Sequence, residues 1–396
     1  MANSILTPTA VTRKIQQVLH GKLVLAKRVN RTYDDSFASS GGKIGDALKI
    51  RLPNKYLIRT GKTLAAQDTA ETSVTLTVAT QIGVDMTFST AELTMQMEDF
   101  AERIIEPACA IVASNIENAI AARYVDVPNL VGTAGTTPAS MLTILQAGAR
   151  LDDNLAPRDR MRTVALSPLA MATMVDAYKG LFQKSGDIAN QYEQGMIEDM
   201  ASGFKWGMCP VINPHVNSAG VVTGITVNDA GITDGETTVT VSTTTTAYSA
   251  GTIVTFAGCY AINEETKVAY SHLKQFVVTS ATATVLTVDP PIYYSATKNQ
   301  NCSAVPTNSG AVTVVGAASG SYPQHLAFHK NWLALATADL EDVSKFGAWG
   351  AREVYDGISI RLARQYDINS DNIPCRLDVL YGVKQLRGEL AVRITG

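Results

Sequence analysis

The chain has 396 residues, of which 46% are hydrophobic and 17% charged, and its 33 Lys and Arg nearly balance its 36 Asp and Glu. This composition is typical of a folded globular protein, and it argues against a disordered chain and against a dedicated nucleic-acid-binding domain. No apolar run approaches the roughly 20 residues that span a bilayer, and no signal-peptide core follows the first residue. We therefore expect a protein that is cytoplasmic where it is made, with no membrane partner.

The N-terminal 62 residues are strongly basic, because twelve Lys and Arg stand against Asp34, Asp35 and Asp46, a net charge of +9. Apolar and polar residues alternate over residues 48–52 and again over residues 74–78, which is the period of half-exposed strands. Two strands joined by so long a polar tip have little core of their own. We expect an extended hairpin that reaches a neighbouring molecule.

Three destinations fit the basic charge: protein–protein contacts, non-specific contact with DNA phosphates, or solvent. The segment lacks the interleaved aromatic residues of single-strand binders, so we do not expect recognition of bases.

A long helix is predicted after this hairpin. Ser89 followed by Glu92 matches a capping box, and apolar residues then recur at spacings of three or four, Ala108 and Ile111 among them, to about residue 124. Pro107 lies inside this run, so a kink or a restart of the helix is expected there.

The following part reads as mixed α and β structure. Residues 137–155 predict a helix, residues 163–166 a short buried strand, and the Ser167-Pro168 pair the start of a helix that ends near residue 178. Near residue 214 the composition changes to Thr, Val, Ala, Ser and Gly. Short alternating runs, separated by Gly, Asn and Pro, predict strands at residues 222–227, 237–241, 252–256, 274–278 and 284–288.

These runs predict a small antiparallel barrel or sandwich. Mixed sequence returns at residues 325–340 and 358–394 and ends in strands near residues 377–381 and 390–394. A β-module flanked on both sides by mixed sequence is typical of a domain inserted into a host domain.

Residues that could carry chemistry are sparse. The five cysteines form no CxxC pair and predict buried free thiols, and only His325 and His329 have a spacing that could place them on one helical face, without the glutamate of HExxH. Adjacent carboxylates at residues 152–153 and 264–265 point apart, so we expect solvated surface. With no nucleotide, nucleophile or phosphate motif, we predict no enzyme activity, no cofactor and no metal.

Three segments carry a resemblance to a known family. Residues 207–213 look like the strand that leads into the inserted barrel of P22-type coat proteins, and residues 375–383 look like the closing strand. Residues 251–258, followed by 276–278 and 285–290, look like the barrel itself. Their order and separation along nearly the whole chain resemble the HK97-like capsid fold in its P22-type variant.

The resemblance implies an α+β capsid fold with an inserted small antiparallel β-barrel. Its expected parts are an N-terminal arm at residues 1–35, an E-loop region at 36–88, a P-domain spine helix at 89–134, a first A-domain part at 135–213, the inserted domain at 214–324, and a second A-domain part with closing P-domain strands at 325–396.

The implied function is that of a major capsid protein, which forms pentamers and hexamers of an icosahedral shell around packaged double-stranded DNA. A scaffolding protein and a portal are the implied partners, and the implied location is the virion capsid. We predict intersubunit contacts at Arg51, Lys55, Arg59 and Lys62. We also predict N-arm contacts at Arg13, Lys14, Lys27, Arg28 and Arg31.

Some proteins of the wider fold join a lysine to an asparagine, but P22-type shells imply no such crosslink here. Two alternatives stay open, an encapsulin-like compartment shell and a β-rich phage tail or decoration protein. The long helix and the basic arm fit the second poorly.

Overall fold

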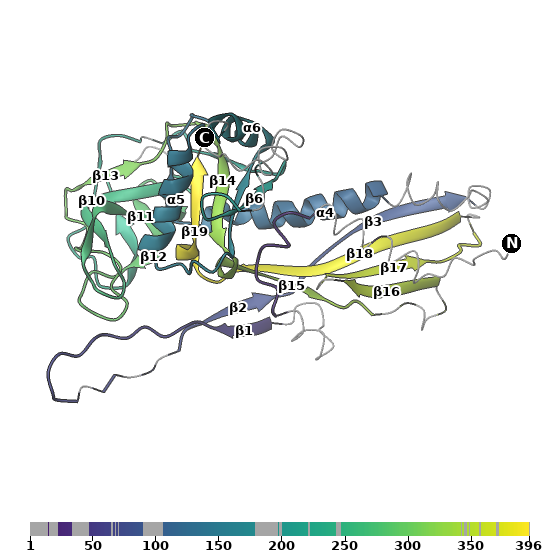
Figure 1. The fold of residues 1–396 in the computed structure, drawn as a ribbon, viewed down its shortest axis with the longest axis horizontal. Helices are drawn as coiled ribbons and strands as arrows, with labels where there is room; N and C mark the ends of the chain where they lie inside the picture. Colours follow the sequence, from purple (N-terminus) through teal and green to yellow (C-terminus); the bar gives the residue numbers. More distant parts are fainter. Residues whose placement is uncertain are drawn as a thin grey trace. The chain divides into compact units, whose positions relative to one another are not determined.

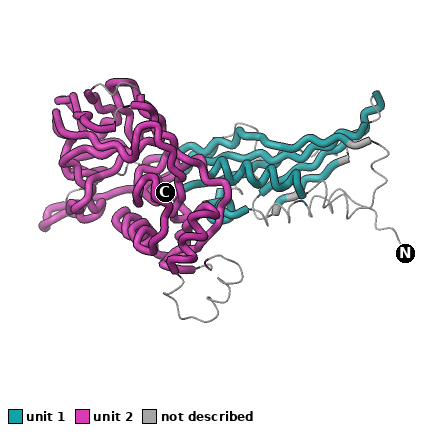
Figure 2. The backbone as a smooth tube through the Cα atoms, turned by 90° about the horizontal axis from the view of Figure 1, so that it is seen from above, with its two compact units in different colours: residues 1–50, 73–120, 333–384 teal, residues 51–72, 121–332, 385–396 magenta. Residues whose placement is uncertain are grey.

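A computed structural model describes residues 15, 23–33, 47–64, 66, 67, 69, 71–89, 106–178, 197, 200–220, 222–242, 247–341, 343, 347, 349–355, 358–369 and 372–395. The chain divides into two compact units, coloured separately in Figure 2. Unit 1 comprises Met1–Ile50, Ser73–Ile120 and Leu333–Lys384, and unit 2 comprises Arg51–Thr72, Ala121–Trp332 and Gln385–Gly396. Within these described ranges, no helix is long and apolar enough to cross a membrane.

Unit 1 is built on a sheet of long strands (Figure 1). The strand order is β15 (Leu333–Ala338), β18 (Asn372–Gln385), β17 (Ile358–Arg364) and β16 (Trp349–Tyr355), and β3 (Thr80–Ser89) also pairs with β18. In β3, half-buried Ile82, Val84 and Met86 alternate with exposed residues, the period-two pattern of a strand with one covered face. The ladder between β3 and β18 runs from Asn372↔Ser89 to Tyr381↔Thr80.

The predicted hairpin strands are confirmed. β1 (Ala47–Arg51) and β2 (Ser73–Thr77) form a two-stranded sheet, in which Ile50 and Leu76 are the buried members of the alternating pattern.

The predicted long helix is described only in part. Helix α4 spans Glu106–Ala121 and is followed by the 3-10 turn η3 (Ala122–Asp126). Ser89, the predicted N-cap, is the last residue of β3, and residues 90–105 lie outside the described part. Ile111, which we assigned to the apolar face, is 54% exposed. Ala108, predicted on the same face, is buried, and the other buried apolar residues of α4 are Cys109, Val112, Ala113, Ile116, Ile120 and Ala121.

Unit 2 contains a mixed sheet of order β4 (Asn129–Val131), β19 (Ala391–Thr395), β14 (Ser321–His329), β5 (Arg162–Leu166) and β6 (Lys205–Met208). β14 runs antiparallel to both of its neighbours, and β7 (Pro214–Val216) pairs with its first residues. Helices α5 (Met141–Asp153) and α6 (Pro168–Tyr178) accompany this sheet, and the Ser140 hydroxyl caps α5 by accepting from the Leu142 N–H at 3.2 Å. These elements confirm the predictions for residues 137–178.

A second sheet of unit 2 has the order β8 (Ile225–Thr226), β13 (Ala311–Val314), β10 (Ile253–Ile262), β11 (Ala269–Ala281), β12 (Val285–Ile292) and β9 (Glu236–Thr240). Its two ends meet: the Asn228 N–H donates to Thr240 O at 2.9 Å, and the Ser242 N–H donates to Thr226 O at 2.8 Å. We call this ring of strands the closed sheet. It surrounds an apolar core in which Phe256 and Phe276 lie 5.5 Å apart between ring centroids.

Side-chain bonds join the closed sheet to the mixed sheet within unit 2. The Gln275 amide accepts from the Leu130 N–H at 2.8 Å and donates to Leu130 O at 3.0 Å, so it pairs with β4 as a neighbouring strand would. The Asn217 amide donates to Val315 O and Ala317 O, both at 3.0 Å. Because these bonds satisfy backbone groups at both sheets, they fix the closed sheet in position on its support.

Candidate assembly interfaces

The loop of residues 52–72, which joins β1 to β2, is held in shape by its own side chains. The Gln67 amide accepts from the Leu57 N–H at 2.9 Å and donates to Leu57 O at 2.6 Å. The Arg59 guanidinium donates to Gly61 O and to Thr63 O, the latter at 2.9 Å. These bonds restrict the backbone at Leu57, Gly61 and Thr63 in a segment that has no core of its own.

Apolar side chains of this loop point into solvent. Ile58 is 90% exposed, Leu64 83% and Tyr56 58%. Three large hydrophobic side chains this exposed within one short segment are a feature to explain, because buried cover is the rule for such residues.

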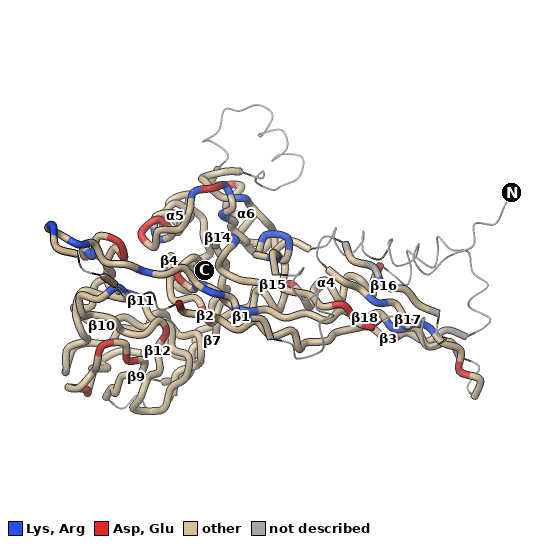
Figure 3. The backbone as a smooth tube through the Cα atoms, turned by 90° about the horizontal axis from the view of Figure 1, so that it is seen from below, with Lys and Arg blue, Asp and Glu red and all other residues tan. Residues whose placement is uncertain are grey.

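The predicted contact residues of the loop fall into two groups. Arg51 pairs with Glu71 at 2.8 Å and Lys55 with Glu264 at 2.6 Å, both within this chain. Arg59 bonds to carbonyl groups of its own loop, and Lys62 is exposed. Figure 3 marks the Lys and Arg positions along this part of the chain.

Glu264 is paired with Lys55 and is not the solvated carboxylate that we expected. Burial alone would raise its pKa, but the ammonium of Lys55, with those of Lys274 and Lys267, holds the pKa below its ordinary value. Lys274 is itself 8% exposed, and burial lowers its pKa. The loop is therefore anchored to the closed sheet through a partly buried charge cluster.

The predicted N-arm residues are described only in part, because Arg13 and Lys14 lie outside the described residues. Lys27, Arg28 and Arg31 are half-buried in the segment 23–33 of unit 1.

Glu117 of α4 holds this N-terminal segment. Its carboxylate accepts three backbone N–H groups, from Val24 at 3.0 Å, Leu25 at 2.7 Å and Ala26 at 2.9 Å. The sequence signal for Glu117 was a lone carboxylate between Ile116 and Ile120 on an apolar helix face, which we did not use.

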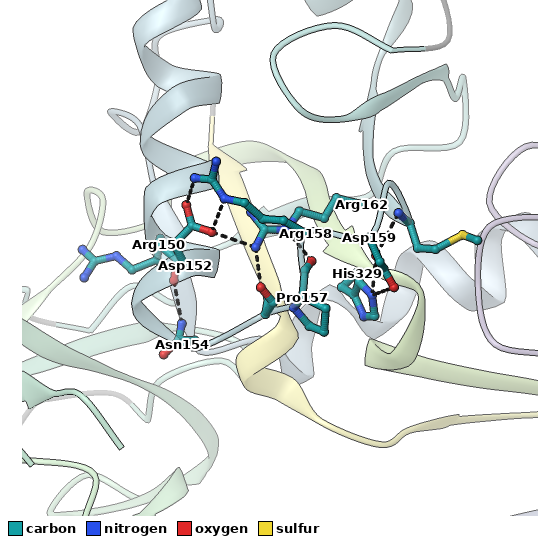
Figure 4. A network of polar contacts seen from close by, with 10 residues as sticks. Arg150, Asp152, Asn154, Pro157, Arg158, Asp159, Arg162 and His329 are labelled. Carbon is teal, nitrogen blue, oxygen red and sulfur yellow. Dashed lines mark hydrogen bonds and ion pairs between the residues drawn. The ribbon is translucent and has the colours of Figure 1, made fainter. Parts of the chain in front are cut away.

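An arginine cluster after α5 also escaped the sequence analysis (Figure 4). Asp152 accepts from Arg158 Nε at 2.9 Å, from Arg158 Nη2, and from Arg162 Nη2 at 2.7 Å. The bond from Arg158 is the main cause that lowers the pKa of Asp152, with a further contribution from Arg162. The expectation that residues 152–153 are simply solvated is therefore wrong for Asp152. The run Pro-Arg-Asp-Arg-Met-Arg at 157–162 was the available signal.

The predicted histidine pair lies on the strand β14 and not on a helix. The Ser167 N–H donates to His325 Nδ1 at 3.2 Å, and His329 Nε2 lies 3.2 Å from the Asp159 carboxylate. Each ring thus has its own protein partner. Among the described residues, no group of three or more His, Cys, Asp or Glu side chains could hold a metal ion.

Comparison with known protein families places the chain among viral coat proteins, because a coat-protein family model matches it over residues 1–396. That model is described as "P22 coat protein - gene protein 5", and the chain belongs to this family. It is accordingly a major capsid protein, a shell-forming homo-oligomer of the virion capsid, and the family is not a class of enzymes.

Comparison with curated proteins finds no match. Among solved structures, the chain is similar to a protein of Mycobacterium phage Che8, with 12% identity, TM-score 0.47, and coverage of 94% of this chain and 90% of that one. The mature capsid of bacteriophage PhiM1 is similar with 11% identity and TM-score 0.41, over 89% of this chain and 82% of that one. The CUS-3 coat protein I-domain is similar with 22% identity and TM-score 0.20, over 25% of this chain and 100% of that one.

Proposed function

We propose that this major capsid protein assembles as pentamers and hexamers into an icosahedral shell that encloses packaged double-stranded DNA. The loop of residues 52–72 carries the proposal, because its backbone is braced while Ile58 and Leu64 are 90% and 83% exposed. A subunit of this kind gains apolar contact area only when a neighbouring copy covers the loop.

The proposed architecture is HK97-like, with the arm at 1–35, the E-loop region at 36–88, the P-domain spine helix at 89–134, the A-domain at 135–213 and 325–396 with closing P-domain strands, and an inserted barrel at 214–324. The closed sheet supports the last assignment, since its six strands form a ring. Helix α4 supports the spine helix.

Arg51, Lys55, Arg59 and Lys62 are proposed to form ion pairs with neighbouring copies. Lys62 can do so directly, and Arg59 can do so through Nε and Nη2 because its bonds to Gly61 O and Thr63 O use Nη1. Arg51 and Lys55 must share or exchange the carboxylates of Glu71 and Glu264. For the N-arm we propose contacts of Arg13, Lys14, Lys27, Arg28 and Arg31 with other copies, with non-specific DNA contact as their second role. A scaffolding protein and a portal complete the proposed partners, and assembly takes place in the host cytoplasm.

The test is assembly of an Ile58→Asp, Leu64→Asp double variant, with Val216→Asp as the control because Val216 is an exposed apolar residue (53%) of β7, outside the loop and its anchor at Glu264. We expect folded subunits by circular dichroism but no shells from the double variant, and normal shells from the control. Normal shells from the double variant would overturn the role of the loop. Particles that hold protein cargo and no DNA would favour the encapsulin-like alternative.

The proposed shell contains no covalent link between subunits. Denaturing gels of mature particles should show a single monomer band, and a ladder of linked subunits would contradict this.

A further inference from the structure

A cavity of about 270 Å³ in unit 2 lies beside the arginine cluster. One face of α5 forms a wall of it through Leu145, Gly148 and Asp152, which lie at helical spacings of three and four. The loop 157–162 and residues 200–204 form the other walls. The cavity belongs wholly to unit 2 and lies outside the loop 52–72 and the N-terminal segment.

The described lining of this cavity carries more positive than negative charge. Among the described residues that line it, three are arginines, Arg158, Arg160 and Arg162, and one, Asp152, is a carboxylate. Asp152 binds Arg158 and Arg162, while Arg160 forms no ion pair within the described part of the chain. Arg162 is 4% exposed and is also bonded to Pro157 O at 2.9 Å, so it is fixed in place. Arg160 is thus free to bind an oxyanion, with the Asp152 cluster as a rigid support.

The surroundings of the cavity are apolar and uncovered. Leu145 and Met200 line it and are 44% and 46% exposed, and Leu142, one turn before Leu145 on α5, is 61% exposed. Arginine and methionine beside exposed aliphatic side chains are the composition of a protein–protein interface. Duplex DNA presents its phosphates on a convex, hydrated surface and gains nothing from aliphatic walls.

The backbone of the cavity is held in an unfavourable conformation. Arg160 has φ +64° and Ser202, in the facing wall, has φ +52°. Left-handed backbone is unfavourable at residues other than glycine or asparagine, and such positions cluster at binding sites.

We propose that this cavity is a docking site for a carboxylate side chain, carried on a partly apolar segment of a second copy of this chain, with Arg160 as the main ligand of the carboxylate. This inference rests on the proposed function, since the second copy is a neighbour in the shell. Charge complementarity selects an acidic segment, and the apolar rim covers the residues that flank it.

Assembly of Arg160 variants tests the proposal. Arg160→Glu should raise the subunit concentration needed for shells about tenfold or more, Arg160→Gln less, and Arg160→Lys least because it keeps the charge without the planar fork. Lys384→Glu is the matched control, since it reverses an exposed charge in unit 1. Circular dichroism of each subunit establishes that it is folded.

A crosslinking experiment identifies the partner. Met161, which is 43% exposed beside Arg160, is replaced by a photoreactive phenylalanine analogue, and shells are assembled from mixed isotope-labelled and unlabelled subunits. We expect crosslinked peptides that join two isotopic populations, with Asp or Glu in the captured segment.

Four outcomes would overturn the proposal: normal assembly of Arg160→Glu, crosslinks confined to one chain, crosslinks only to a different protein, or normal shells that fail only in DNA retention, which would identify phosphate as the ligand. In each of these the wild-type shells still form and the proposed function stands. If the wild-type chain forms no shells, the proposed function fails, and the proposal fails with it.

Discussion

Arg393 Nη1 donates a hydrogen bond of 2.7 Å to the carbonyl oxygen of Gly251. Arg393 lies on β19 and has no exposed surface, and its Nε donates to Val127 O at 2.8 Å. Its guanidinium also lies 5.4 Å from the ring centroid of Tyr124. One buried cation therefore joins three parts of unit 2: strand β19 of the mixed sheet, the end of η3, and the segment that enters β10 of the closed sheet.

Removing this cation should weaken unit 2 strongly. Arg393→Ala leaves the carbonyl groups of Val127 and Gly251 without donors and opens a cavity, so we expect a loss of about 3–5 kcal/mol in the free energy of unfolding. Urea denaturation measures it. Arg123→Ala is the control, because Arg123 is half-exposed and pairs with Asp126 at 3.6 Å, and it should cost about 1 kcal/mol or less. Equal effects of the two variants would contradict the role of Arg393.

Gly251 itself should resist substitution. It has φ +96°, and an added Cβ would lie 3.1 Å from Val125 Cγ1 and 3.2 Å from His215 Cε1. Gly258 has φ +79° with no atom within 4 Å of an added Cβ, so it separates the backbone cost from the steric one. Thermal unfolding should show Gly251→Ala to be less stable than Gly258→Ala by about 1–3 kcal/mol. A control variant as unstable as Gly251→Ala would exclude crowding as the cause.

Acid should destabilise unit 2 through His325. Burial lowers its pKa from 6.5 to about 4, and Nδ1 must stay unprotonated to accept the Ser167 N–H. The unfolded chain binds more protons between these two pKa values, so stability is present above pH 6.5 and is lost as the pH falls towards 4. The full effect is up to about 3 kcal/mol.

His325→Asn keeps an acceptor for Ser167 but does not titrate. Urea midpoints measured from pH 7 to pH 4 should therefore fall less for this variant than for the wild type. His215, whose pKa is also lowered to about 4, by burial and by Arg393, should leave the variant some pH dependence. An unchanged slope would show that His325 does not contribute.

Glu117 should control the order of the N-terminal segment. Glu117→Ala leaves the N–H groups of Val24, Leu25 and Ala26 without their acceptor, and each buried unpaired donor costs about 1–3 kcal/mol. We expect a loss of at least about 3 kcal/mol and fast hydrogen exchange at these amides, with a smaller effect of Glu117→Gln, which keeps one acceptor oxygen. Asn118→Ala, on the exposed face of α4, should leave exchange unchanged. Slow exchange in Glu117→Ala would contradict the anchoring role.

Local patterns predicted many of the elements of this chain. The alternating runs at 252–256, 274–278 and 284–288 coincide with β10, β11 and β12, because strand periodicity is a local property. β3 was not predicted, although Ile82, Val84 and Met86 alternate with Gly83, Asp85 and Thr87. Its last residue, Ser89, also matches the N-cap of a capping box, so the local sequence fits both a strand end and a helix start.

The contacts at the candidate sites join residues that are far apart in the sequence, and a single sequence does not show which residues pair. Glu117 and Leu25 are 92 residues apart, and Gln275 and Leu130 are 145 apart. Lys55 was selected from its charge alone, without its partner Glu264. Asp152 and Arg162 are close in sequence, but the turn that brings them together has Leu155 at φ +58°. A leucine does not predict a left-handed backbone conformation, so this turn could not be predicted.

Electron microscopy of particles from cells that express the chain with a scaffolding protein tests the central claim most directly. We predict closed icosahedral shells whose capsomers are pentamers and hexamers of this chain, with residues 52–72 lying on a neighbouring subunit. A chain that stays a compact monomer at high concentration and forms no shells would contradict the account.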